Sequence, residues 1–131
     1  MSYVPPYSVI KDRFTFSGKN GDVQASIGYE DLREVLKLCL RAVAVDEDWY
    51  RNTYPDVAQS IDEGQLPSAK HHFVENGYFE GRMPCAIQVD ENYYVTAYPD
   101  IAQGIQEGLI ASASEHFRDY GYAEGRLPVA Y

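Results

Sequence analysis

The chain contains an internal duplication. Residues 45–86 align without gaps with residues 89–130, and 23 of the 42 aligned positions are identical. A repeat of this length is typical of a supersecondary unit that stacks on its copy to complete a hydrophobic core. The sequence therefore predicts three parts: a hairpin and capping helix in residues 1–44, and helical repeats in residues 45–88 and 89–131.

Local signals predict three short helices in each repeat, so the fold class is mainly α. In the first repeat, Asp46 is a good N-cap, and Pro55 suits the first turn of a second helix that ends near Gly64. A third helix is expected to begin near Ser68. The same signals recur 44 residues later, which predicts a matching trio in the second repeat.

The repeated string "GYFEGRMP" and "GYAEGRLP" is interpreted as a helix stop followed by a tight turn. Gly77 and Gly121 are expected at the C′ position, where glycine adopts a left-handed conformation at least cost. The tyrosine after each glycine would then contact the phenylalanine of the same helix, as in Tyr78 against Phe73.

The N-terminal segment predicts a short hairpin and one amphipathic helix. The stretch "RFTFSGKNGDVQASIG" alternates around a turn cluster and places Phe14 and Phe16 on one face. The stretch "YEDLREVLKLCLRAVAV" has apolar residues at helical spacing over about four turns. We expect this helix to pack with the hairpin and cap the repeats, with a homodimer interface as the alternative.

The net charge of −9 argues against nucleic acid and anionic lipid as partners, because both require a basic face. Residues 1–44 carry six Lys or Arg and five Asp or Glu, whereas residues 45–131 carry five and fifteen. All the excess negative charge therefore lies in the repeats. It forms either a solvated surface or a docking face for a basic protein partner.

Tyrosine is abundant in the repeats, which hold nine of the twelve. Many of these rings are needed to fill the gaps between short helices. Those left outside, with Tyr93, Tyr120 and Tyr131 as candidates, would form a surface for sugar stacking or for protein binding.

The repeats also carry equivalent histidines, arginines and aspartates. His72 and His116 invite a metal site, but one histidine per repeat favours a structural role in which the ring donates to a carbonyl. Arg82 and Arg126 are expected to clamp the repeat through a bidentate bond to Asp56 and Asp100 respectively. The alternative is that each arginine receives a carboxylate or a sugar phosphate.

Motifs for catalysis and for cofactors are absent. The sequence has no Gly-rich phosphate loop, no nucleophile elbow, no HExxH and no EF-hand spacing. The carboxylates of "DED" at residues 46–48 lie at a helix start, where negative charge opposes the positive end of the helix dipole. We therefore expect a protein that is not an enzyme and has no cofactor.

The two cysteines, Cys39 and Cys85, have neither metal spacing nor a CxxC arrangement, so reduced thiols are expected. The start "MSYVPPYSVIKDRF" lacks the basic leader and apolar segment of a secretory signal, and no apolar run approaches the length of a membrane span. These features predict a cytoplasmic location.

The motif "YPDVA", then "HF", then "GYFEGRMP" resembles a bacterial tandem helical repeat. Modules of that kind occur beside glycosyltransferase domains of envelope polysaccharide synthesis and within some large secreted proteins. The resemblance covers residues 45–130, and it supplies no catalytic residues that map onto this sequence. It implies an accessory or interaction module, with polysaccharide synthesis as one setting. The predicted function is a non-catalytic scaffold that binds a protein partner, and the alternative is a carbohydrate-binding or regulatory accessory.

Overall fold

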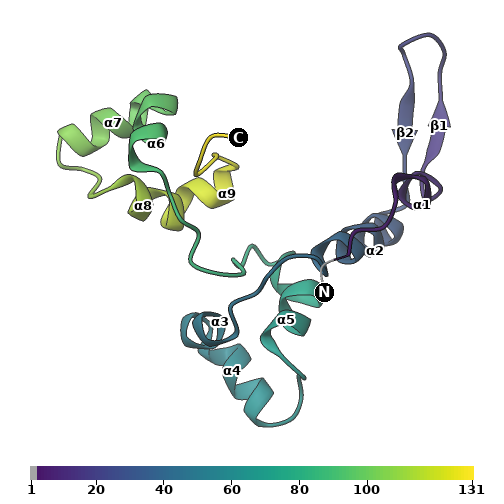
Figure 1. Cartoon of the computed structure of the whole chain (residues 1–131), viewed down its shortest axis with the longest axis horizontal. Helices are drawn as coiled ribbons and strands as arrows, with labels where there is room; N and C mark the ends of the chain where they lie inside the picture. Colours follow the sequence, from purple (N-terminus) through teal and green to yellow (C-terminus); the bar gives the residue numbers. More distant parts are fainter. Residues whose placement is uncertain (1–2) are drawn as a thin grey trace. The chain divides into compact units, whose positions relative to one another are not determined.

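The structure is a computed structural model that describes residues 3–131, and it is mainly helical with one short hairpin near the N-terminus (Figure 1). The chain divides into two compact units, Met1–Cys85 and Ala86–Tyr131. The first unit holds the N-terminal segment together with the first repeat, and the second holds the second repeat.

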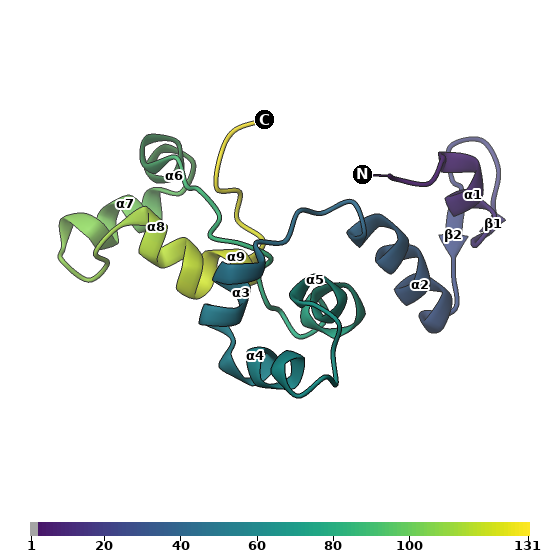
Figure 2. The same cartoon turned by 60° about the horizontal axis from the view of Figure 1, so that its bottom comes forward.

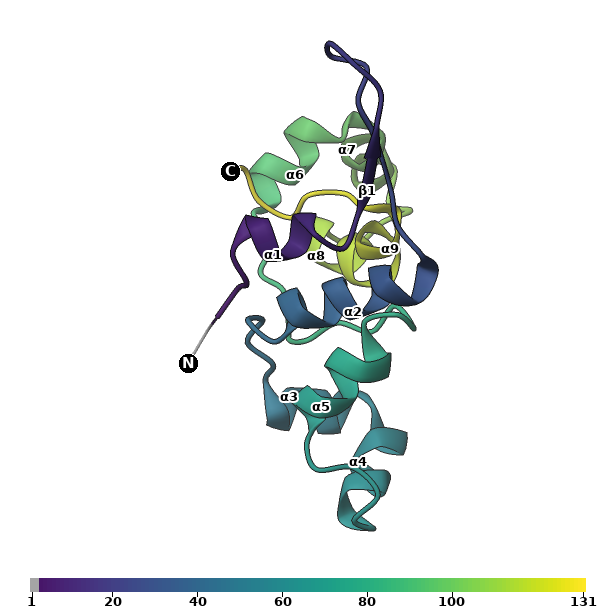
Figure 3. The ribbon, with the colours of Figure 1, turned by 90° about the vertical axis from the view of Figure 1, so that its right-hand side faces the viewer.

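The hairpin lies between two helices of the N-terminal segment (Figure 3). Helix α1, Tyr7–Lys11, precedes it and was not predicted from the sequence. Strands β1, Thr15–Ser17, and β2, Gln24–Ser26, pair antiparallel with Thr15 opposite Ser26. The rings of Phe14 and Phe16 lie 6.3 Å apart, yet every strand residue is exposed. The predicted hairpin forms, but its strands are not buried against the following helix.

Helix α2, Tyr29–Leu40, forms where the apolar spacing predicted a helix, and it packs against the first repeat. Val35 and Leu40 are buried, and Leu40 joins the core of the first repeat. Lys37 Nζ lies 2.9 Å from a carboxylate oxygen of Glu75, and the Arg33 guanidinium lies 4.0 Å from the centre of the Phe79 ring. Figures 2 and 3 show α2 beside the third helix of this repeat.

The three predicted helices of the first repeat are present. The side chain of Asp46 accepts a bond from Trp49 N, that of Ser68 accepts one from His71 N, and Pro55 opens the second helix. The third helix changes from α to π geometry midway, and Tyr78 N donates to the Phe73 carbonyl at 2.9 Å. The elements are α3, Glu47–Thr53; α4, Pro55–Asp62; α5, Ala69–His72; and η1, Phe73–Gly77.

The second repeat reproduces this order with the same caps, since Asp90 accepts from Tyr93 N and Ser112 from Glu115 N. A further short helix follows the π segment here. The elements are α6, Glu91–Ala97; α7, Pro99–Gln106; α8, Ala113–His116; η2, Phe117–Gly121; and α9, Tyr122–Glu124.

Each repeat has its own core and closes on itself. Tyr50 is fully buried in the first cluster, and Tyr94 is fully buried in the second. The chain then returns to its start, because Asp46 N donates to the Pro84 carbonyl at 3.0 Å and Asp90 N donates to the Pro128 carbonyl at the same distance. Each copy is therefore a closed loop of helices that is tied at its two ends.

The structure corrects the role predicted for Gly77 and Gly121. Neither is left-handed: Gly121 has a φ of −61° and ψ of −38°, and both residues lie at the end of a π segment. A Cβ at Gly77 would overlap the Tyr50 hydroxyl, and one at Gly121 would overlap the Tyr94 hydroxyl. Glycine is needed there because a buried tyrosine approaches the backbone, and the left-handed turn falls four residues later, at Gly81 and Gly125.

Candidate functional site

A buried tyrosine and a histidine form the centre of each repeat. Tyr50 Oη lies 2.9 Å from His72 Nδ1, and Tyr94 Oη lies 2.9 Å from His116 Nδ1. The tyrosine comes from the first helix of the repeat and the histidine from the third, so this bond joins the two. The partner of each histidine is therefore a tyrosine hydroxyl, and the predicted carbonyl partner is wrong.

The repeated arginine clamps the second helix, as predicted. The guanidinium of Arg82 donates to both carboxylate oxygens of Asp56 at 3.0 and 2.8 Å, and also to Glu80 at 3.1 Å. It lies 4.9 Å from the centre of the Tyr54 ring, whose hydroxyl accepts a bond from Met83 N. The arginine therefore binds two carboxylates of its own repeat, those of Asp56 and Glu80.

The second copy repeats this clamp. Arg126 donates to both oxygens of Asp100 at 3.0 and 2.9 Å, to Glu124, and lies 4.8 Å from the Tyr98 ring centre. Only about a fifth of each arginine side chain is exposed, 22% for Arg82 and 20% for Arg126. Both guanidinium groups are occupied by carboxylates of their own repeat and are poorly placed to receive a ligand.

A glutamate caps the third helix of each repeat, and sequence reasoning missed it. The Glu47 carboxylate accepts bonds from Ala69 N at 2.8 Å and Lys70 N at 3.2 Å. Glu91 holds the equivalent amides of Ala113 and Ser114. The two partners are 22 residues apart, so no local pattern could have revealed the bond, although glutamate does recur at this position in both copies.

These contacts shift the pKa values of the groups involved. Burial raises the pKa of the Tyr50 hydroxyl, and burial lowers the pKa of His72, which favours a neutral ring. The hydrogen bond from Arg82 lowers the pKa of Asp56 to about 2. A protonated tyrosine bonded to a neutral histidine, beside a clamp that is ionised at neutral pH, has the chemistry of a structural network.

Most acidic side chains of the repeats serve as caps or ion-pair partners. Their charge remains, but their geometry is fixed by the repeat itself. The carboxylates with such a partner, beyond the caps and clamps described above, are those of Asp62 with Arg51, Glu75 with Lys37, and Asp119 with Arg118.

Two of the candidate tyrosines, Tyr93 and Tyr120, have different surroundings. Tyr93 is half-buried, whereas Tyr120 is 63% exposed on η2. The Tyr120 ring lies 5.8 Å from the His116 ring, and on the same segment Arg118 is paired with Asp119 at 3.0 Å. Tyr120 therefore presents an aromatic surface among charged side chains.

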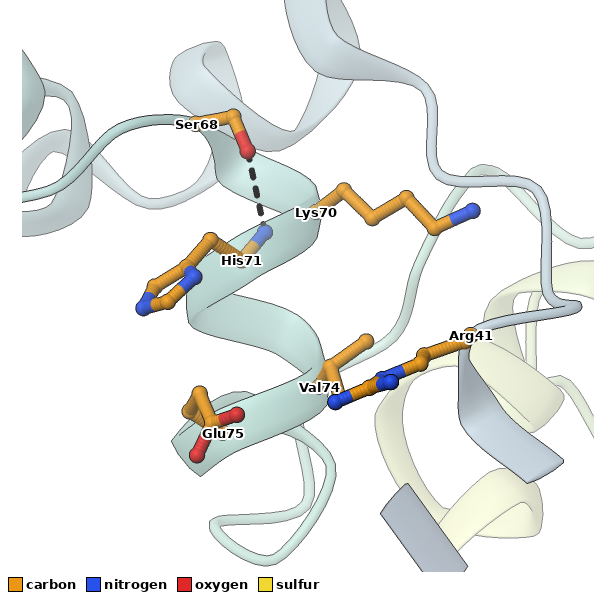
Figure 4. A pocket seen from close by; sticks show the side chains of 6 residues that line it. All are labelled: Arg41, Ser68, Lys70, His71, Val74 and Glu75. Carbon is orange, nitrogen blue, oxygen red and sulfur yellow. Dashed lines mark hydrogen bonds between the residues drawn. The ribbon is translucent and has the colours of Figure 1, made fainter. Parts of the chain in front are cut away.

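An open depression of about 330 Å³ lies over the third helix of the first repeat (Figure 4). Sequence reasoning gave no hint of this feature, because its lining comes from two segments that are distant in the chain. The lining residues are Arg41, Ser68, Lys70, His71, Val74 and Glu75.

The part of the chain that the structure describes contains no group of three His, Cys, Asp or Glu side chains arranged to hold a metal ion. None of its helices has the length and apolar character needed to cross a membrane. No family model matches the chain, and neither a curated protein nor a solved structure matches it.

Proposed function

We propose that this protein is a non-catalytic interaction module that binds a protein partner through the surface of its second repeat around Tyr120. The exposure of Tyr120 is the observation that carries this proposal, since tyrosine is enriched in protein interfaces. The equivalent residue of the first repeat is Asn76. The repeat framework therefore does not require an aromatic ring at this position.

The negative charge of the repeats supports a basic partner. Residues 45–131 carry a balance of −10, and a field of this sign raises the rate of encounter with a basic protein. Because the caps and clamps hold most carboxylates in place, we assign the negative charge to electrostatic steering of the basic partner toward the repeats. Tyr120 and its neighbours would form the direct contact with that partner. A bacterial cytoplasm is the proposed setting.

The test is affinity capture from a cell extract with the wild-type chain and with Tyr120→Asn, the residue that the first repeat uses. Captured proteins are identified by mass spectrometry at low and high salt. Thr96→Asn is the matched control, since Thr96 is exposed and the first repeat has Asn52 there. We expect one basic protein that is retained by wild type and by the control, lost with Tyr120→Asn, and weakened by salt. Capture that is the same with all three chains would contradict the proposal.

A carbohydrate ligand is the second candidate. The Tyr120 ring next to His116, with carboxylates nearby, is an aromatic surface on which a sugar face could stack. A glycan-binding screen with the same three chains separates the candidates. Saturable glycan binding that Tyr120→Asn abolishes would favour the accessory role over the protein partner.

A further inference from the structure

The depression over the third helix of the first repeat has an excess of positive charge, in a chain with a net charge of −9. Arg41 and Lys70 line it together with His71. Among residues 3–131, the structure gives neither Arg41 nor Lys70 an ion-pair partner, whereas the one carboxylate in the lining, Glu75, is already paired with Lys37.

The side chains of Arg41, Lys70 and His71 are accessible in the depression. Figure 4 shows Lys70 and Arg41 on one side of the helix and His71 on the other, with Val74 between them. The Ser68 hydroxyl accepts from His71 N at 3.0 Å and the Lys70 amide is bonded to Glu47, so the helix-end amides are occupied. Any anion bound here would therefore contact side chains.

Comparison with the second repeat shows that the framework does not require this charge. Lys70 and His71 correspond to Ser114 and Glu115, in a helix that has the same caps and the same buried phenylalanine. Packing of α2 accounts for Val74, which belongs to the core cluster, but it accounts for neither Lys70 nor His71. The two basic side chains are a property of the first repeat alone.

We infer that this depression is a binding site for a small oxyanion, a phosphate group in the first place. Guanidinium and ammonium groups are the usual hydrogen-bond donors to bound phosphate in proteins. A volume of about 330 Å³ is within the range of small-molecule pockets. The lining residues belong to the first unit and Tyr120 to the second, so the two proposals rest on different residues.

The test is a titration of the ¹⁵N-labelled full chain with inorganic phosphate, with ionic strength held constant by chloride. We expect saturable chemical-shift changes confined to Arg41 and to residues 68–75. A parallel titration with succinate shows whether a dicarboxylate binds as well. If succinate saturates the same residues more tightly, the site takes carboxylates and the preference for phosphate is overturned.

The double variant Lys70→Ser/His71→Glu introduces the residues of the second repeat and should fold, since that helix folds with them. It should weaken phosphate binding by more than about tenfold, because it removes charge-assisted donors. Arg41→Gln is an independent variant with the same expected direction. Lys19→Ser removes a charge from the exposed hairpin turn and should leave the affinity unchanged.

Two results would overturn the inference. One is the absence of saturation with both anions, and the other is an equal loss of affinity with Lys19→Ser, which would show a general effect of net charge.

Discussion

The two repeats have one framework and two different surfaces. Caps, the arginine clamp and the Tyr–His bond are the same in both, with matching atoms and nearly matching distances. The face of the third helix differs. Val74 in the first repeat is 5% exposed in contact with the core, and its counterpart Arg118 has a side chain that is 61% exposed.

This difference follows from what covers each face. In the first repeat α2 supplies Leu40 to the core and Arg33 to the Phe79 ring. The second repeat has Ala123 where the first has Phe79, and that alanine is exposed. The closed loop of three helices is therefore a unit that tolerates either a packed or a solvated third-helix face, and that face is where the copies have diverged.

The largest effect on stability is expected when Val74, on the covered third-helix face of the first repeat, is replaced by arginine, the residue on the exposed face of the second repeat. Val74→Arg places a charge in the contact with α2 and should lower the free energy of unfolding of the first unit by about 3 kcal/mol. Amide hydrogen exchange should accelerate in residues 29–85 and stay unchanged in residues 86–131. Equal acceleration in both units would show that the two repeats do not respond separately.

A smaller effect is expected at the glycines that both copies share. Gly121→Ala brings a methyl group onto the Tyr94 hydroxyl and should cost about 2 kcal/mol in chemical denaturation. Gly125→Ala, at a φ of 77° in open space, should cost only about 1 kcal/mol through its left-handed backbone.

The double variant Gly121→Ala/Tyr94→Phe should recover part of the stability lost with Gly121→Ala, because it removes the hydroxyl. If Gly125→Ala lowered the free energy of unfolding more than Gly121→Ala does, the helix-stop interpretation of Gly121 would be reinstated.

The arginine–aspartate clamp should contribute less to the free energy of unfolding than the two glycines, and its contribution should be similar in both copies. Asp56→Asn should cost about 0.5 kcal/mol at neutral pH, because the carboxylate is mostly exposed and the ion pair is screened by solvent. The folded-state pKa of about 2 lies below the unfolded value near 3.9, so this stability is present above about pH 4 and is lost as the pH falls toward 2. Thermal melts from pH 7 to pH 2 measure the difference from wild type.

A loss in the same direction and with the same pH dependence is expected with Asp100→Asn, since Arg126 lowers the pKa of Asp100 through an equivalent bond. A difference between wild type and Asp56→Asn that persists at pH 2 would assign the effect to packing rather than to charge.

The smallest effect is expected from the reverse exchange. Arg118→Val introduces the residue of the first repeat on an exposed face and should leave the free energy of unfolding nearly unchanged. A large loss, measured by denaturant unfolding, would mean that Arg118 and Asp119 stabilise the second repeat in a way the exposed ion pair does not suggest.

Local signals predicted the elements because the partners are close in sequence. Asp46, Ser68 and Pro55 each act within their own first turn, and the amphipathic spacing of α2 identifies the face that becomes buried. The bond between Arg82 and Asp56 was also predictable, since the same pair recurs in both copies and its chemistry is specific.

The errors arose where the deciding contact is distant along the chain. Gly77 was assigned to a left-handed cap because the sequence pattern of a helix stop is local, whereas the Tyr50 hydroxyl that excludes a side chain there comes from another helix. The same reason hid the Glu47 cap and the Tyr50 partner of His72.

The sequence by itself determined the duplication, the mainly helical class and the starts of the repeat helices, because duplicated strings and helix caps can be recognised from residues that are close in the chain. Only the tertiary structure decided which copy α2 covers, which tyrosines are buried, and that Arg41 lines the same depression as Lys70 and His71. These depend on the burial of side chains from separate segments, and burial is a property of the packed chain.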